Sequence, residues 1–271
     1  MVLEGGALHI KLPRGQKKLK GELQEIGMAR INVRNEVDIE DGFFIEGVPG
    51  AGLAGKIAAD HLIENLDMEL HATVEAEGLP EVLIFEEGDR HLRPPVRIFA
   101  DEDTGIYALT SDVLISPVES GDFSGVLVDW IEENSITPLM LSGLPSKDEG
   151  DKKLYGVEVG EEEMLDEADI GVPDQTGLVG GPTGAMLHEL EKRGMDGACL
   201  VVQTHPQFPD PIAAKRLVDG GVEKLVDFDV DTEVLEERAE KIKEQKEKLA
   251  QMLQNAESHE KGQAFPEGMY E

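Results

Sequence analysis

Apolar residues along this chain form short runs that alternate with longer segments of helical spacing. The runs at residues 42–48, 139–142 and 198–203 are bounded by glycine or polar residues, which predicts strands. Apolar positions that recur three or four residues apart predict helices, and these lie at residues 51–66, 124–134, 161–168, 184–193 and 211–218. Strands that alternate with helices predict an α/β sandwich around a central sheet.

Residues 70–115 depart from this alternation because they hold several short strand candidates in succession. These are residues 72–77, 82–86, 96–101 and 106–111, separated by Gly, Pro and Asp. Such close spacing is typical of hairpins, whose strands are antiparallel. We therefore expect the central sheet to be mixed.

Local signals mark four of the helix boundaries. Ser124 is a candidate N-cap for the helix at 124–134. Gly194 follows the helix at 184–193 and is expected to end it. Pro211 is suited to the first turn of the next helix, and the Gly220-Gly221 pair is expected to stop that helix.

The segment at residues 231–258 has a different pattern. Its a and d positions form a single stripe, occupied by Leu235, Ala239, Ile242, Lys246, Leu249 and Leu253. An amphipathic helix with so thin a stripe needs a partner surface in water. Two interpretations remain open: the helix lies back on its own domain, or it is an oligomer helix that associates through Leu235, Ile242, Leu249 and Leu253.

The polar composition of residues 259–271 predicts a flexible tail, which ends in Met269, Tyr270 and Glu271. Such an end offers an aromatic ring to bury, a phenol to hydrogen-bond and an α-carboxylate to pair with a cation. We expect it to be a docking motif for another protein. The alternative is an ordinary frayed terminus, since chain ends are often disordered.

The chain is strongly acidic, with 57 Asp and Glu against 25 Lys and Arg and a formal net charge of −32. This charge repels nucleic acid and anionic membranes, so neither is an expected partner. It also destabilises a compact state unless salt screens it. We infer that the protein works in the cytoplasm of a halophilic archaeon.

The sequence predicts four parts of the chain, of which the first is set apart by its charge. Residues 1–27 hold five basic and three acidic residues, the reverse of the balance elsewhere. We interpret them as a disordered basic leader or a mis-annotated start, with the true start at Met28; the alternative is a functional basic arm. The other parts are an α/β domain at 28–230, the amphipathic helix at 231–258 and the tail at 259–271.

Catalytic and metal-binding patterns are weak. Cys199, the sole cysteine, lies in an apolar strand pattern, so neither a disulfide nor a cysteine zinc site is expected. The seven histidines show no HxH or HExxH spacing, and there is no GxSxG elbow. No apolar run reaches 18 residues, and the N-terminus has no hydrophobic signal core. We expect no enzyme activity, no cofactor and no metal.

Two glycine-rich segments each precede a helix. The first is a candidate anion-binding or structural loop that consists of Gly47, Gly50, Gly52, Gly55 and Lys56. It matches GxGxxG and nearly matches a P-loop, but Ile57 replaces the Ser or Thr that would hold magnesium. Three interpretations remain: close helix–strand packing, an anionic ligand and an NTPase. The second segment, at 177–184, is either a set of tight turns or an anion-binding nest.

Four segments together resemble one known family. They are residues 44–62, which contain the first glycine loop, residues 141–145, residues 177–187 and the Asp210-Pro211 pair. These are similar to the signatures of the archaeal proteasome-assembly-chaperone family. The resemblance implies a three-layer α/β/α sandwich with a nucleoside-phosphorylase-like layout, used as a binding scaffold, and a homo-oligomer that acts with the proteasome core particle.

The resemblance also gives the tail a role. In relatives, a hydrophobic–Tyr–any ending enters pockets between the α-subunits of the core particle, and Met269, Tyr270 and Glu271 match this pattern. The family implies that Tyr270 supplies the buried ring and that the Glu271 carboxylate meets a lysine. The basic leader departs from the family pattern. The leading hypothesis is therefore a proteasome assembly chaperone or activator-like protein. The rivals are a nucleotide- or phosphate-binding α/β enzyme that uses the Gly50–Lys56 loop and a plain oligomeric scaffold.

Overall fold

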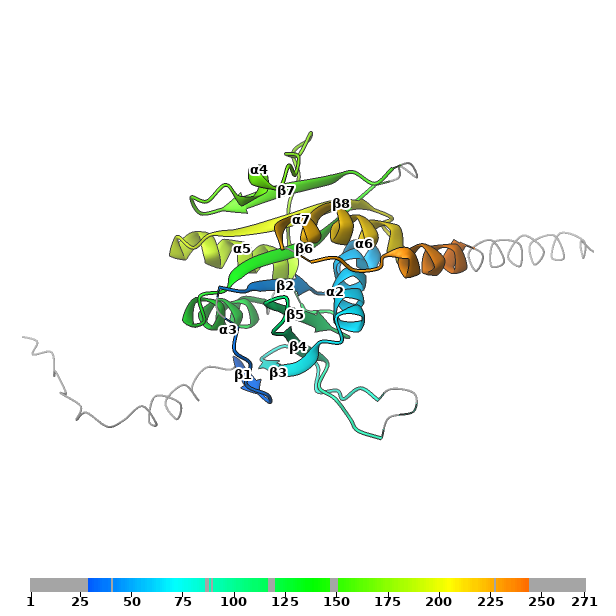
Figure 1. Cartoon of the computed structure of the whole chain (residues 1–271). Helices are drawn as coiled ribbons and strands as arrows, with labels where there is room; N and C mark the ends of the chain where they lie inside the picture. The colour runs from blue at the N-terminus through cyan, green and yellow to red at the C-terminus, as the bar shows by residue number, and fades with distance from the viewer. Residues whose placement is uncertain are drawn as a thin grey trace, which may run out of the picture.

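The computed structural model describes residues 29–39, 41–85, 88, 90–116, 120–146, 151–226 and 228–243. Its strands are β1 (Ala29–Val33), β2 (Phe43–Gly47), β3 (Glu69–Ala76), β4 (Val96–Asp101), β5 (Ile106–Ser111), β6 (Thr137–Pro145), β7 (Leu154–Val159) and β8 (Gly197–Thr204). They form one sheet in the order β1-β3-β4-β5-β2-β6-β8-β7 (Figure 1).

The sheet is mixed, as the sequence predicts. The four central strands, β5, β2, β6 and β8, are parallel. β1, β3 and β4 continue the sheet from β5 as an antiparallel meander, and β7 pairs antiparallel with β8 at the opposite edge. Because the central strands run the same way, their carboxyl ends share one edge, where α/β proteins commonly place ligand sites.

Helices cover both faces of the sheet (Figure 1). The helical elements are η1 (Ala51–Leu53), α2 (Ala54–Asn65), α3 (Ser120–Glu133), α4 (Met164–Glu167), α5 (Gly181–Arg193), α6 (Pro211–Leu217), η2 (Val218–Val222) and α7 (Glu223–Leu225). Residues 233–243, at the end of the described part, are also helical. α2 packs with α6 on one face and α3 with α5 on the other. This confirms the predicted three-layer α/β fold.

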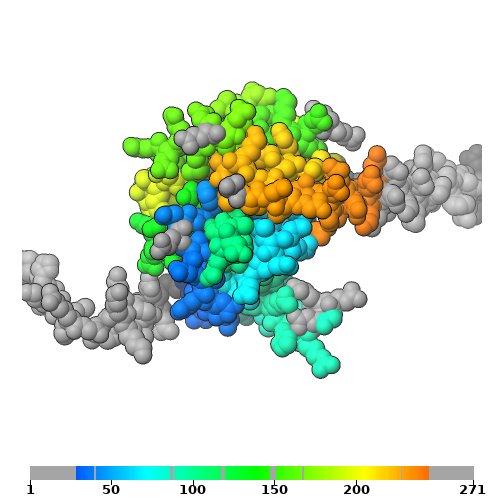
Figure 2. All heavy atoms as spheres, in the orientation of Figure 1, coloured from blue at the N-terminus to red at the C-terminus, as the bar shows by residue number. Residues whose placement is uncertain are grey.

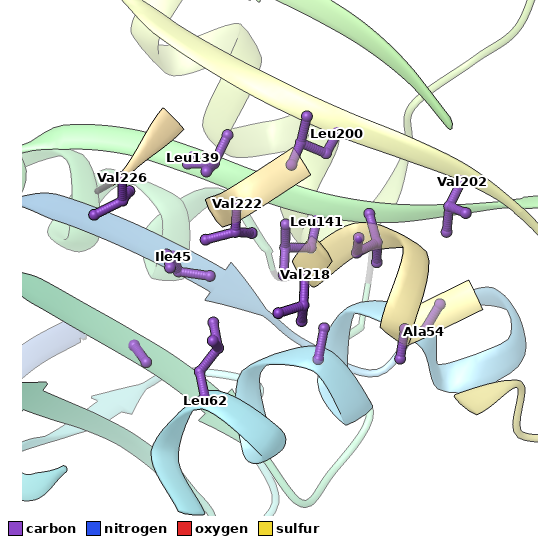
Figure 3. Close-up of a cluster of buried hydrophobic side chains, with 14 of the residues drawn as sticks. Ile45, Ala54, Leu62, Leu139, Leu141, Leu200, Val202, Val218, Val222 and Val226 are labelled. Atoms are coloured by element: carbon purple, nitrogen blue, oxygen red, sulfur yellow. The ribbon is translucent and has the colours of Figure 1, made fainter. Parts of the chain in front are cut away.

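Successive side chains of β2 point to opposite faces of the sheet, so this strand contributes to a core cluster on each face. Ile45 belongs to the cluster on the α2 side, and Phe44 belongs to the cluster on the α3 side; both are fully buried. Figure 3 shows the α2-side cluster, in which Ile45 and Leu139 from adjacent strands lie opposite Leu62 and Val218 from the helices. In the described part of the chain, no helix is both long and apolar enough to cross a membrane.

Two predicted elements differ from the structure, and two strands were not predicted. Residues 82–85 of the strand predicted at 82–86 form no strand, and Ile84 makes only an isolated bridge to Arg93. Phe85 in this segment is 78% exposed, so its apolar run has no core face to cover. The acidic helix predicted at 161–168 is reduced to α4. The sequence missed β7, an edge strand with charged neighbours and a central glycine, and β1, which lies directly after the predicted leader.

Two predicted helix boundaries are also wrong. α3 begins at Ser120, so Ser124 lies inside the helix, where it is buried and donates to the Pro182 carbonyl at 3.4 Å. The Gly220-Gly221 pair does not stop α6, because the chain continues as the π-helical turn η2. A Cβ at Gly221 would lie 2.5 Å from Leu200 Cδ1, so this glycine is needed for close approach to β8. The predicted end at Gly194 is confirmed: it is left-handed and caps α5.

Candidate functional site

The glycine-bearing segments converge at the carboxyl edge of the parallel strands. η1 and its preceding loop follow β2 and pack against Gly143 of β6 and against Thr204, the last residue of β8. The backbone N–H of Asp210, just before α6, donates to the Gly52 carbonyl at 2.8 Å. Segments far apart in sequence thus form one junction, which is the natural place to examine for a ligand site.

Close packing accounts for most of the glycines in the first loop. Gly52 has φ +60, and a Cβ there would overlap the Thr204 hydroxyl. A Cβ at Gly55 would lie 2.7 Å from the Leu141 carbonyl, and one at Gly47 would overlap the Ala59 methyl. Gly50 differs, because it is extended and faces open space. The loop geometry therefore favours the packing interpretation over a cradle for phosphate.

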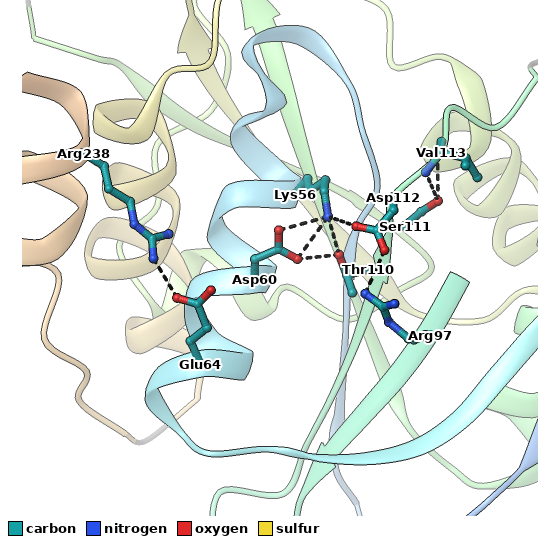
Figure 4. A network of polar contacts seen from close by, with 9 residues as sticks. All are labelled: Lys56, Asp60, Glu64, Arg97, Thr110, Ser111, Asp112, Val113 and Arg238. Carbon is teal, nitrogen blue, oxygen red and sulfur yellow. Dashed lines mark hydrogen bonds and ion pairs between the residues drawn. The ribbon is translucent and has the colours of Figure 1, made fainter. Parts of the chain in front are cut away.

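Lys56, the residue that suggested a P-loop, is already paired (Figure 4). Its Nζ lies 3.0 Å from Asp60 and 3.1 Å from Asp112, and it donates to Thr110 Oγ1 at 3.1 Å. Arg97 approaches the other oxygen of Asp112 at 2.8 Å. Two cations therefore meet two carboxylates, and little positive charge remains for a phosphate. Together with Ile57, this disfavours the NTPase interpretation.

Asp210, just before α6, makes several polar contacts on the other side of the junction. Its side chain caps α6 by accepting from Ala213 N at 3.1 Å, and it accepts from His205 N at 2.9 Å. Lys152 Nζ lies 3.2 Å from the same carboxylate. Burial alone would raise the pKa of Asp210, but these hydrogen bonds and the Lys152 charge outweigh it and lower the pKa. Asp210 is therefore an ionised structural cap.

Glu46 joins the two glycine-rich segments. It is fully buried on β2, and both of its carboxyl oxygens lie within hydrogen-bond distance of Thr183 Oγ1 in the first turn of α5, at 3.0 and 3.3 Å. Burial raises the pKa of Glu46 to about 8, although the hydrogen bonds from Thr183 and from the Val48 backbone lower it in part. The carboxyl is therefore protonated at neutral pH, and the second glycine segment is held by a neutral hydrogen bond.

This buried acid makes stability depend on pH. The folded pKa of about 8 exceeds the ordinary 4.5, so the stabilising contribution of protonated Glu46 is complete below about pH 4.5 and is lost as the pH rises to about 8. We expect the Glu46→Gln substitution to remove a slope of about 1.4 kcal/mol per pH unit in this window. Denaturant titrations at pH 6, 7 and 8 measure it, with Glu191→Gln on the exposed face of α5 as the control. Equal slopes in wild type and Glu46→Gln would contradict the assignment.

The residues predicted to bind partners fall mostly outside the described part of the chain. Met269, Tyr270, Glu271, Leu249 and Leu253 all lie beyond residue 243. Two oligomer-helix positions are described. Leu235 is 0% exposed and belongs to the α2-side core cluster, whereas Ile242 is half-buried. The first turn of the helix therefore lies back on its own domain, and Leu235 is not free to contact another copy.

The fold and this junction define the class of protein: a three-layer α/β domain with glycine packing and internal ion pairs at the carboxyl edge of its parallel strands. The family is defined by sequence. The chain belongs to the PAC2 family, whose model matches residues 44–250. A protein of Methanocaldococcus jannaschii with no assigned function is 28% identical over 217 residues, which cover 80% of this chain and 88% of that one.

Solved structures agree with this assignment. Pyrococcus furiosus PbaA, an archaeal homolog of proteasome-assembly chaperone, is 26% identical with a TM-score of 0.73, over 87% of this chain and 97% of that chain. Pyrococcus furiosus PbaB, an archaeal proteasome activator, has a TM-score of 0.72 at 23% identity, over 83% of this chain and 99% of that chain. The protein is thus similar in structure to proteasome assembly chaperone homologues, and the likeness to PbaB concerns the fold alone.

Proposed function

We propose that this protein is a proteasome assembly chaperone or activator-like protein that binds the α-ring of the core particle through its C-terminal tail. The observation that carries the proposal is membership of the PAC2 family, together with the structural similarity to PbaA over 87% of the chain. The paired Lys56 and the packed glycines at the carboxyl edge support a scaffold over a phosphate-using enzyme.

The tail supplies the contact chemistry in this proposal. Tyr270 buries its ring in a pocket between α-subunits, Met269 adds apolar contact, and the Glu271 carboxylate pairs with a lysine. High salt screens the ionic part, so the ring supplies most of the affinity. Several tails on one homo-oligomer would engage the ring together and raise the overall affinity well above that of one tail.

The proposal also fixes a division of the chain. It keeps the predicted division into an α/β domain at 28–230 as the scaffold, an amphipathic helix at 231–258 and a tail at 259–271 that carries the docking motif. The net charge of −32 supports an origin in a halophilic archaeon. Low-salt conditions are therefore unsuitable for any binding assay.

Co-purification with the host core particle tests the partner. We expect the tagged full-length chain to retain assembled α-rings in molar KCl and the Tyr270→Ala variant to lose most of this retention. Phe265→Ala, which removes a ring from the tether and leaves the last three residues intact, is the matched control and should bind as wild type does. Retention of no α-subunit by the full-length chain would refute the proposed partner.

A further inference from the structure

The start of the C-terminal helix is seated on the body of the protein. After α7 the chain runs through residues 228–232 and enters the helix at 233–243. Leu235, in the first turn of that helix, is 0% exposed and packs in the α2-side core cluster, whereas its neighbour Val234 is 38% exposed. Figure 2 shows this part of the chain, in orange, set against the surface that α2 and α6 form.

Polar contacts hold the same segment from both flanks. On the α2 side, Arg238 forms an ion pair with Glu64 at 2.7 Å. On the α6 side, Lys215 Nζ donates to Thr232 Oγ1 at 2.7 Å and lies 3.6 Å from Glu236. The helix therefore meets α2 and α6 at the same time, and its buried leucine lies between two polar attachments.

Hydrogen bonds also hold the segment that leads into the helix. Asp231 Oδ1 accepts from Glu233 N at 2.9 Å, an Asx turn that leads into the helix. The preceding residue, Val230, donates its N–H to Glu223 Oε1 at 2.9 Å. The Asx turn, the Val230 hydrogen bond and the buried Leu235 thus hold the start of this helix at one place on the body, from which the helix projects (Figure 1).

We propose that Leu235 is a positioning residue: it anchors the start of the C-terminal helix between α2 and α6, so that the chain that carries the docking tail leaves the domain from a fixed point. This inference rests on the proposed tail contact. A tail that leaves the body from a fixed point loses less orientational freedom on binding than one on a freely pivoting helix. In an oligomer, fixed exit points also let several tails reach their pockets together. Leu235 itself touches no partner.

Hydrogen exchange on the full-length protein in molar KCl tests the anchor without any partner. We expect Leu235→Ala to speed exchange of the amides at 236–243 by about tenfold or more, the graded Leu235→Val to do so less, and Val234→Ala to leave it unchanged. Amides of β2 and β6 report whether the body stays folded in each variant. Exchange at 236–243 in the wild type as fast as in an unstructured peptide would overturn the anchor.

The affinity of the Leu235 variants for the core particle tests whether the anchored helix helps the tail to bind. We expect Leu235→Ala to weaken binding by about tenfold, through lost pre-organisation and avidity, yet to bind more tightly than a chain without Met269–Glu271. Fast exchange at 236–243 combined with wild-type affinity would overturn the positioning role. The two proposals fail separately: if removing the last three residues has no effect, the tail contact is wrong, while the exchange data still decide whether Leu235 anchors the helix.

Discussion

Transfer of the protein from molar salt to dilute buffer is expected to unfold the domain. The net charge of −32 comes from 57 acidic residues, of which the 25 basic residues can pair with fewer than half. The Debye length grows from about 3 Å at 1 M salt to about 30 Å at 0.01 M, so carboxylates across the whole surface begin to repel one another. Unfolding separates these charges, and the usual net stability that must oppose this repulsion is only about 5–15 kcal/mol.

Far-UV circular dichroism during dialysis measures this effect. We expect the helical signal to fall sharply below a few tenths molar KCl. As a control for irreversible damage, restoring molar KCl should return the signal. A spectrum that stays the same in dilute buffer would show that the acidic surface imposes no salt requirement, and the inference of a halophilic origin would be wrong.

Gly52→Ala is expected to destabilise the domain by about 2–5 kcal/mol. The residue has φ +60, a region that costs an L-residue roughly 1–2 kcal/mol. The new methyl group would also overlap the Thr204 hydroxyl and approach the His205 carbonyl at 3.0 Å. Thr204 cannot turn away freely because its hydroxyl donates to Asp210 at 3.2 Å. Relief of such overlap by shifts in a packed core typically costs about 1–3 kcal/mol more.

Gly50→Ala is the matched control for this prediction. Gly50 lies two residues earlier in the same loop, has φ −138 and would place its Cβ in open space. We expect it to change the free energy of unfolding by less than about 0.5 kcal/mol. Denaturant unfolding of both variants in molar KCl makes the comparison. Equal stability of the two variants would mean that the loop does not pack against β8 as described.

Strong local patterns made most of the fold predictable from sequence. The segments that became β4 and β5 were predicted with both boundaries correct, because each is short, apolar and bounded by turn residues. The segment at 82–86 has a similar pattern and is not a strand. Strand formation there depends on a neighbouring strand and a core to cover, and neither is visible in the local sequence.

The candidate site was harder to predict, because it is built from contacts between distant residues. Whether Gly52 packs or cradles a ligand depends on Thr204, which lies about 150 residues away in sequence. Lys56 matched a P-loop position, and only the fold brings Asp112 to it. Glu46 lies in the 44–62 segment that resembles the family, and the sequence predicted no role for it. Its one further signal was its place as the only charged residue in an otherwise apolar strand, at 43–48.

The surface that the C-terminal helix packs against could not be predicted from the sequence either. The a/d stripe identified Leu235 as a position that needs a partner surface, but the sequence could not say which surface. The structure places Leu235 in the core of its own domain. Ile242, two turns further on, is only half-buried, so any association of this helix with other copies would begin beyond the anchor.

The most direct test of the proposed function is the affinity of the assembled core particle for the full-length chain and for a chain that lacks Met269–Glu271, both measured in molar KCl. The tail contact predicts a loss of about 100-fold or more on deletion, with the domain still folded by circular dichroism. Equal affinity of the two chains would contradict it, because some other surface would then hold the core particle.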